Sequence, residues 1–198
     1  MMKKENNKES WKPGNMIYPL PAVMVSCANK EQQANIITIA WTGTICTNPA
    51  MCYISIRPER YSYNLIKETE EFVINLTTEK LARACDWCGV KSGRDEDKFK
   101  KMKLHMEPAK KLSYAPIIVE SPVNIECKVT EIKELGSHHM FIANVVNVQV
   151  DSKAMESSGK LALNKTGLIA YSHGEYFELG KNLGNFGYSV RKDKKKKN

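Results

Sequence analysis

Short runs of β-forming residues, separated by turn residues, constrain the fold of this chain more than any other feature. In the first half these runs are residues 36–41, 51–56 and 72–76. Gly43 and the Asn48-Pro49 pair separate the first two, and both are turn signals. We therefore expect each run to be a strand.

The second half is more clearly β. Apolar residues alternate with polar ones over residues 123–129, which predicts a strand with one buried and one solvent-facing side. Apolar residues also share one face over residues 140–150. Residues 168–171 and 175–179 form a last pair that turns at His173-Gly174.

Three short helical stretches interrupt the strands. Ser62 is a fair N-cap for a helix over residues 63–71, and Thr78 for one that continues to about residue 87. After a loop over residues 89–93, a charged helical piece covers about residues 95–103. No repeat is visible. Many short strands with few helices predict a mainly β, antiparallel barrel with short helices rather than a doubly wound sheet.

The formal net charge of +8 belongs to the ends of the chain. Residues 1–12 carry +2 and residues 189–198 carry +5, which leaves +1 for residues 13–188. A run such as residues 194–197, all lysine, is usually a solvated tail. No aromatic residue alternates with these lysines as single-strand binding would require. We expect no nucleic-acid partner, and we keep a basic-tailed nucleic-acid module as the lowest-ranked alternative.

Six cysteines raise the questions of disulfides, metal and compartment. A chain of 198 residues does not need disulfides to fold. Most of the cysteines lie in apolar, strand-like surroundings, where free cysteine behaves as a small buried hydrophobe. Cys85 and Cys88 form a C-x-x-C motif that would suit redox chemistry or half a zinc site, but no second pair completes such a site. We expect no metal, and a reducing, cytoplasmic compartment.

The length suits one domain with extended ends. We expect a flexible segment over residues 1–15, a domain over residues 16–190 and a basic tail over residues 191–198. No apolar run approaches the length of a membrane span. Residues 16–28 could be compared with a signal peptide, but prolines interrupt them and Val23-Met24-Val25 also suits a first strand.

Two groups of residues suit an anion. Ser62 offers a hydroxyl near a helix N-terminus, with Arg57 and Arg60 just before it. Ser92-Gly93-Arg94, followed by Lys98, offers a second set of donors. Nucleotide-binding glycine loops are absent. Taken alone, these residues suit a capped helix and a solvated charged face better than an anion site.

The sequence resembles the flavin reductase-like family with an FMN-binding split barrel, of the flavoredoxin type. Four stretches carry the resemblance, and residues 171–187 continue it. They are residues 35–43 with 46–49, residues 55–62 with 70–76, residues 88–99, and Gly136-Ser137-His138 with residues 141–146. The chain departs from the family pattern at Asn144, Ser62 and the second imidazole, His139.

The resemblance implies FMN held non-covalently at the edge of the barrel, completed by a homodimer partner. It implies no certain catalytic residue, although His138 would be a nicotinamide contact. It does not say whether His138 or His139 faces the flavin. The cofactor-binding residues it implies are Asn35, Thr38, Ile39, Ala40, Trp41, Thr42, Cys46, Ser62, Lys98, His138 and Tyr171.

The implied function is an FMN-binding oxidoreductase. It would move electrons from a reduced nicotinamide, NAD(P)H, or from a partner protein through bound FMN to an acceptor. The alternative is a non-catalytic FMN-binding electron carrier. Neither reading involves a membrane.

Overall fold

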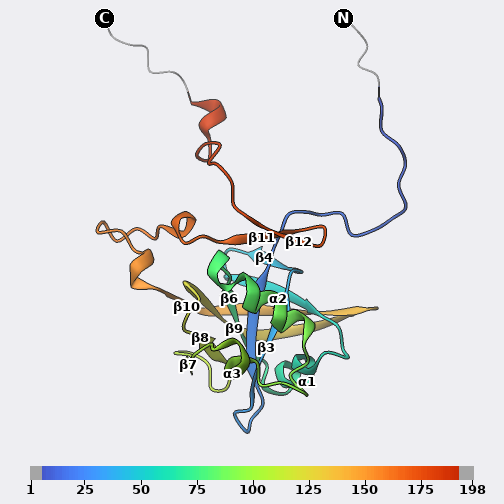
Figure 1. Cartoon of the computed structure of the whole chain (residues 1–198), viewed down its shortest axis with the longest axis vertical. Helices are drawn as coiled ribbons and strands as arrows, with labels where there is room; N and C mark the ends of the chain where they lie inside the picture. Colours follow the sequence, from blue (N-terminus) through green and yellow to red (C-terminus); the bar gives the residue numbers. More distant parts are fainter. Residues whose placement is uncertain (1–5, 192–198) are drawn as a thin grey trace, which may run out of the picture.

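The computed structural model describes residues 6–191 and is built mainly from antiparallel strands (Figure 1). The strands are β1 (Leu20–Pro21), β2 (Val23–Ala28), β3 (Ala34–Ile39), β4 (Thr42–Cys46), β5 (Met51–Ile56), β6 (Glu71–Leu76), β7 (Met106–Pro108), β8 (Pro116–Ile118), β9 (Val123–Leu135), β10 (His138–Val150), β11 (Ile169–Ser172) and β12 (Glu175–Glu178). The helices are α1 (Tyr61–Thr69), α2 (Ala82–Val90) and α3 (Lys98–Met102), with short 3₁₀ turns at Glu79–Leu81, Ser152–Ala154, Leu163–Lys165 and Tyr188–Val190.

One seven-stranded antiparallel sheet forms the barrel, in the order β3-β2-β6-β9-β10-β5-β4. Its interior is filled by aliphatic, aromatic and cysteine side chains, among them the fully buried Phe72 and Phe141. A second apolar cluster lies where α2 and α3 cover β2 and β3. The mainly β, antiparallel prediction is confirmed.

A small second sheet, in the order β1-β11-β12, lies beside the barrel (Figure 1). Its hairpin turns at His173 and Gly174, whose φ angles are 51° and 97°. Such left-handed values at both central positions suit a tight two-residue turn. The predicted last pair of strands and its turn are therefore confirmed, and the pair carries Tyr171 and Tyr176 towards α2.

The structure corrects the predicted helix N-caps. Helix α1 begins at Tyr61 with Arg60 in the cap position, so Ser62 lies in the first turn and is not the cap. The Ser62 hydroxyl instead accepts a hydrogen bond from the Asn35 side-chain amide at 2.8 Å. Thr78 does occupy the N-cap position of the 3₁₀ turn that leads into α2, but its side chain makes no capping hydrogen bond. In each case a contact outside the local sequence, or a different turn, determines the helix start.

Other boundaries also move. Helix α1 ends two residues before predicted, because Glu70 adopts a left-handed φ of 57° and Glu71 already belongs to β6. Strand β3 ends at Ile39, two residues early, and α2 continues through Gly89 to Val90. The charged helical piece shortens to α3, where the Asp97 carboxylate caps the backbone N–H of Lys100 at 3.0 Å.

The prediction of a solvent-facing side on residues 123–129 is wrong at Asn124 and Glu126. These side chains are 5% and 0% exposed. Residues 104–121 cover them. This segment, which includes the short strands β7 and β8, is called here the fastened loop. The Glu126 carboxylate accepts the backbone N–H groups of Lys110 and Lys111 at 3.1 and 2.7 Å. The strand does alternate apolar and polar residues. Its polar side is nevertheless buried, under a loop that supplies hydrogen bonds to these polar side chains.

All six cysteines are free thiols, and only Cys46 is not buried. Burial raises the pKa of both Cys85 and Cys88 to about 11, so both remain protonated at neutral pH. Among residues 6–191, no helix is both long and apolar enough to cross a membrane. The predicted lysine run of the tail lies outside the described residues.

Candidate functional site

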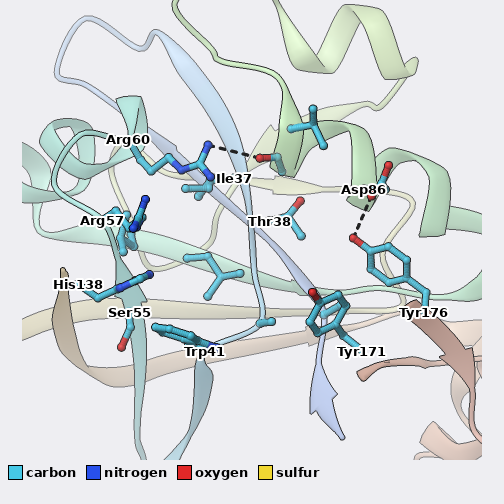
Figure 2. Close-up of a pocket in the computed structure, with 16 residues that line it drawn as sticks. Ile37, Thr38, Trp41, Ser55, Arg57, Arg60, Asp86, His138, Tyr171 and Tyr176 are labelled. Atoms are coloured by element: carbon cyan, nitrogen blue, oxygen red, sulfur yellow. Dashed lines mark hydrogen bonds between the residues drawn. The ribbon is translucent and has the colours of Figure 1, made fainter. Parts of the chain in front are cut away.

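Two adjoining cavities lie between the edge of the barrel, α1, α2 and the β11–β12 hairpin. The first, the aromatic cavity, has a volume of about 380 Å³ and contains Trp41, His138, Tyr171 and Tyr176 in its wall (Figure 2). The second, the cationic cavity, has about 320 Å³. It is lined by Arg57, Arg60, Lys91, Arg94 and Lys98, with Glu59 as its one carboxylate. The two cavities share Ile37, Arg57, Arg60 and Gly89.

The end of β3 and the residues after it form one wall of the aromatic cavity. Trp41 follows the strand, and its carbonyl accepts the backbone N–H of Ser55 at 2.9 Å, which holds this segment against β5. The Trp41 ring lies 4.3 Å from the His138 ring between centroids. Extended backbone and a flat indole therefore stand side by side, as a planar ligand requires.

Gly89 allows α2 to approach β3 closely. A Cβ atom added at Gly89 would stand 3.0 Å from Cβ of Thr38. The Thr38 hydroxyl also donates to the Cys85 carbonyl. The carboxyl end of α2 therefore packs directly on β3 and forms part of the cavity wall.

Cationic side chains cap the exposed carbonyls at this end of α2. The Lys98 amine donates to the carbonyls of Cys88 and Ile36, each at 2.7 Å, and Arg60 donates to the carbonyl of Gly89 at 3.5 Å (Figure 2). Cations are favourable near the negative end of a helix. Burial lowers the pKa of Lys98, although the nearby Cys88 and Cys27 thiols act in the opposite direction.

The loop after α2 closes the cationic cavity against α1 and β3. A Cβ atom at Gly93 would lie 2.2 Å from the side-chain oxygen of Asn35 and 2.8 Å from the ring of Tyr61. No larger residue fits there without moving the loop. The bare backbone at Gly93 and the first turn of α1, at Tyr61 and Ser62, thus meet at one cavity. Unpaired amides of a helix first turn favour anions.

The structure brings nine of the eleven predicted cofactor residues to the two cavities. Those in the aromatic cavity are Thr38, Ile39, Ala40, Trp41, His138 and Tyr171. Those in the cationic cavity are Asn35, Ser62 and Lys98. Thr42 and Cys46 line neither: the buried Thr42 hydroxyl donates to the Tyr53 carbonyl at 2.6 Å, and Cys46 ends β4.

The side chains of the two neighbouring histidines have different surroundings. His138 lines the aromatic cavity, whereas Nδ1 of His139 lies 2.8 Å from the Tyr63 hydroxyl. Burial lowers the pKa of His138, and the charge of Arg57 lowers it further. Both effects favour the neutral form of the His138 imidazole.

Three polar residues that line the aromatic cavity were missed in the sequence: Ser55, Asp86 and Tyr176. Asp86 lies between Cys85 and Cys88, which are buried on one face of α2, so helical spacing places Asp86 away from that face. Tyr176 pairs with Tyr171 across the predicted hairpin. Both signals were present, but neither indicates a site until the hairpin and helix are placed together.

Comparison with known proteins gives consistent matches. A family model described as "Flavin reductase like domain" matches residues 16–180. An uncharacterized protein of Pyrococcus abyssi is 30% identical over 161 residues, covering 81% of this chain and 91% of its own length. The structure of flavoredoxin of Desulfovibrio vulgaris (Miyazaki F) has a TM-score of 0.85 and 28% identity, covering 93% of this chain and all of its own. An FMN-binding protein from Thermus thermophilus has a TM-score of 0.75 and 20% identity, covering 93% and 99%.

Proposed function

Because the chain belongs to the flavin reductase-like family and has its antiparallel split-barrel fold, we propose that it is an FMN-dependent oxidoreductase. It would take electrons from a reduced nicotinamide or a redox partner protein and pass them to an acceptor. One observation carries this proposal: a cavity walled by aromatic residues and backbone opens into a second cavity rich in cations.

The cationic cavity suits the phosphate of FMN. Among the described residues, five cationic side chains and one carboxylate line this cavity. Its net charge is therefore positive, and an anion would neutralise it. The Ser62 hydroxyl, which accepts from Asn35, lines this cavity and would donate its own proton to the phosphate. Arg60 reaches both cavities and would hold the phosphate close to the ring. Lys98 contributes its charge, while two of its three N–H groups remain on carbonyls.

The aromatic cavity suits the ring system of a flavin. When bound, the flavin supplies the hydride and electron chemistry. Trp41 and the backbone after β3 would orient the ring, and Tyr171 would shield it from water. His138, in the same cavity wall, would contact the nicotinamide. The described cavity walls contain no group to which we assign general acid or base catalysis.

We further propose that a second copy of the chain completes the site. Apolar side chains on the second half of β10 are unusually open: Val146, Val148 and Val150 are 37%, 48% and 37% exposed. Ile45 on β4 is 48% exposed. Contiguous exposed apolar residues mark protein interfaces more often than free surface.

We place the protein in the cytoplasm, since its six thiols are all free and a reducing compartment would keep them so. The division into a domain over residues 16–190 with extended ends remains our prediction.

Flavin titration and anaerobic reduction test the main proposal. Added FMN should bind to the flavin-free protein and quench its tryptophan emission, and riboflavin should bind more weakly because it lacks the phosphate. NADH or NADPH, added without oxygen, should bleach the yellow complex within seconds to minutes. A protein that binds no FMN would refute the proposal, and a complex that neither nicotinamide bleaches would favour the non-catalytic electron carrier.

A further inference from the structure

One end of the aromatic cavity differs chemically from the end that meets the cationic cavity. Arg57, Arg60 and His138 lie at the shared end, whereas Asp86, Tyr171 and Tyr176 lie at the other (Figure 2). Asp86 is the one carboxylate among the described residues that line this cavity. A planar ligand there would have cations at one end and an anion at the other.

Asp86 is held in place by the hairpin. The Tyr176 hydroxyl donates to one Asp86 carboxylate oxygen at 3.2 Å. Burial raises the pKa of Tyr176, with the nearby Cys85 and Asp86 adding to the effect, so the phenol keeps its proton. The Tyr176 ring in turn meets the Tyr171 ring edge to face at 5.5 Å.

The second oxygen of Asp86 makes no hydrogen bond within residues 6–191. It is therefore available to an N–H donor of a ligand. The cationic end of the cavity is separated from it by Ile37, Thr38 and the backbone of β3. No arginine or lysine lies within 4 Å of Asp86 in the described part of the chain. Asp86 is itself an exposed residue, so its charge would act most strongly once a ligand in the cavity excludes water from it.

We propose that Asp86 sets the reduction potential of the flavin by placing a fixed negative charge at this end of the cavity. The inference rests on the proposed function, because it requires a flavin in the aromatic cavity. Reduction adds negative charge to the flavin ring, and a neighbouring carboxylate repels that charge. The site would thus bind the oxidised flavin more tightly, relative to the reduced form, than a site without the carboxylate. A protein with this preference is the stronger electron donor.

Two substitutions separate this role from a structural one. Asp86→Asn removes the charge but keeps an oxygen that accepts from Tyr176. Tyr176→Phe removes the hydrogen bond but keeps the charge. If Asp86 only tied the hairpin to α2, Tyr176→Phe would change the midpoint potential more than Asp86→Asn does. Glu175→Gln is the matched control, because Glu175 lies on the same hairpin and lines neither cavity.

The experiment measures the dissociation constant of oxidised FMN and the midpoint potential of the complex for each variant. We expect Asp86→Asn to favour the reduced form by about tenfold. For a two-electron couple this is a shift of about 30 mV to more positive potential. Tyr176→Phe should shift the potential by less than Asp86→Asn, and Glu175→Gln should stay within twofold of the wild type.

The outcomes are distinct. An unchanged potential in Asp86→Asn, with FMN still bound, would overturn this inference and leave the proposed function intact. A shift in Tyr176→Phe as large as that in Asp86→Asn would overturn it in favour of a structural tie. A wild-type protein that binds no FMN would remove the proposed function and this inference together.

Discussion

The fastened loop and the cationic cavity both bury charge, but they satisfy it in opposite ways. Under the fastened loop, the carboxylates of Glu71 and Glu126 accept backbone N–H groups of the same chain. In the cationic cavity, Lys98 and Arg60 donate only to neutral carbonyls. In the first region, groups of the same chain satisfy the buried carboxylates. The second region retains a net positive charge.

The difference shows how to tell a structural charge from a binding charge. Glu126 is 0% exposed and has four hydrogen-bond donors: two backbone groups and the amides of Asn147 and Gln149. Lys98 is nearly as buried, at 4%, but no carboxylate lies within 4 Å of its amine among the described residues. A buried charge without a counter-charge costs stability, so its retention suits a ligand that supplies the opposite charge.

The largest effect is expected in the fastened loop. Glu126→Ala removes the buried acceptor of four hydrogen bonds, which should cost about 4 kcal/mol of the free energy of unfolding. Urea denaturation followed by circular dichroism measures this loss. The dissociation constant of FMN should remain within twofold of the wild type. A large loss of FMN affinity in the folded variant would mean that the two regions are coupled, contrary to the comparison.

The cationic cavity should respond in the reverse manner. Arg60→Gln removes a charge that reaches both cavities and should weaken FMN binding by about 30-fold, or about 2 kcal/mol. Stability should change by less than about 0.5 kcal/mol, as for most exposed positions. Riboflavin affinity, measured by the same fluorescence titration, should change by less than twofold. An equal loss for riboflavin would place the phosphate elsewhere.

A smaller effect is expected at Ser62. Ser62→Ala removes one hydroxyl donor and should weaken FMN binding about fivefold, or about 1 kcal/mol. Ser62→Thr keeps the hydroxyl and serves as the conservative control in the same titration. Wild-type affinity in Ser62→Ala would show that the hydroxyl serves only Asn35.

The smallest effect is a pH dependence of the fastened loop. Burial alone would raise the pKa of Glu126, but the hydrogen bonds from Asn147, Lys111, Lys110 and Gln149 outweigh it and hold the pKa below the ordinary value of 4.5. The ionised carboxylate therefore stabilises the fold above pH 4.5, and this contribution disappears as pH falls through the lower folded pKa.

Glu126→Gln should flatten this acid dependence by about 0.5 kcal/mol per pH unit near pH 4. Urea denaturation at a series of pH values from 6 to 3.5 measures the slope. Parallel slopes for the variant and the wild type would exclude Glu126 as the titrating group. Glu31→Gln, at an exposed position between β2 and β3, provides the comparison.

The same contrast explains which features the sequence predicted. Trp41, Thr38 and their neighbours were found because a contiguous segment carries the family resemblance, and this segment does line the aromatic cavity. Arg57 and Arg60 were recognised as anion-binding candidates because they directly precede a helix. Local patterns suffice where a site is built from consecutive residues.

Contacts distant in sequence were not predictable. Glu126 looked solvent-facing because its partners lie 15 and 16 residues away, in a loop without a periodic pattern. Asp86 gained significance only when a hairpin 90 residues later brought Tyr176 beside it. Ser62 was misplaced as a cap because the Asn35 amide, 27 residues earlier, binds its hydroxyl.

The missing side chain at Gly89 has a consequence for how this site can diversify. Residues such as Trp41, His138 and Tyr171 present side chains to the cavity and can be exchanged without rebuilding the backbone. A side chain at position 89 would instead meet Thr38 closer than ordinary van der Waals contact, so α2 or Thr38 would have to shift by a few tenths of an ångström. Substitutions that change what the aromatic cavity binds are therefore expected at Trp41, His138 and Tyr171, and are disfavoured at position 89.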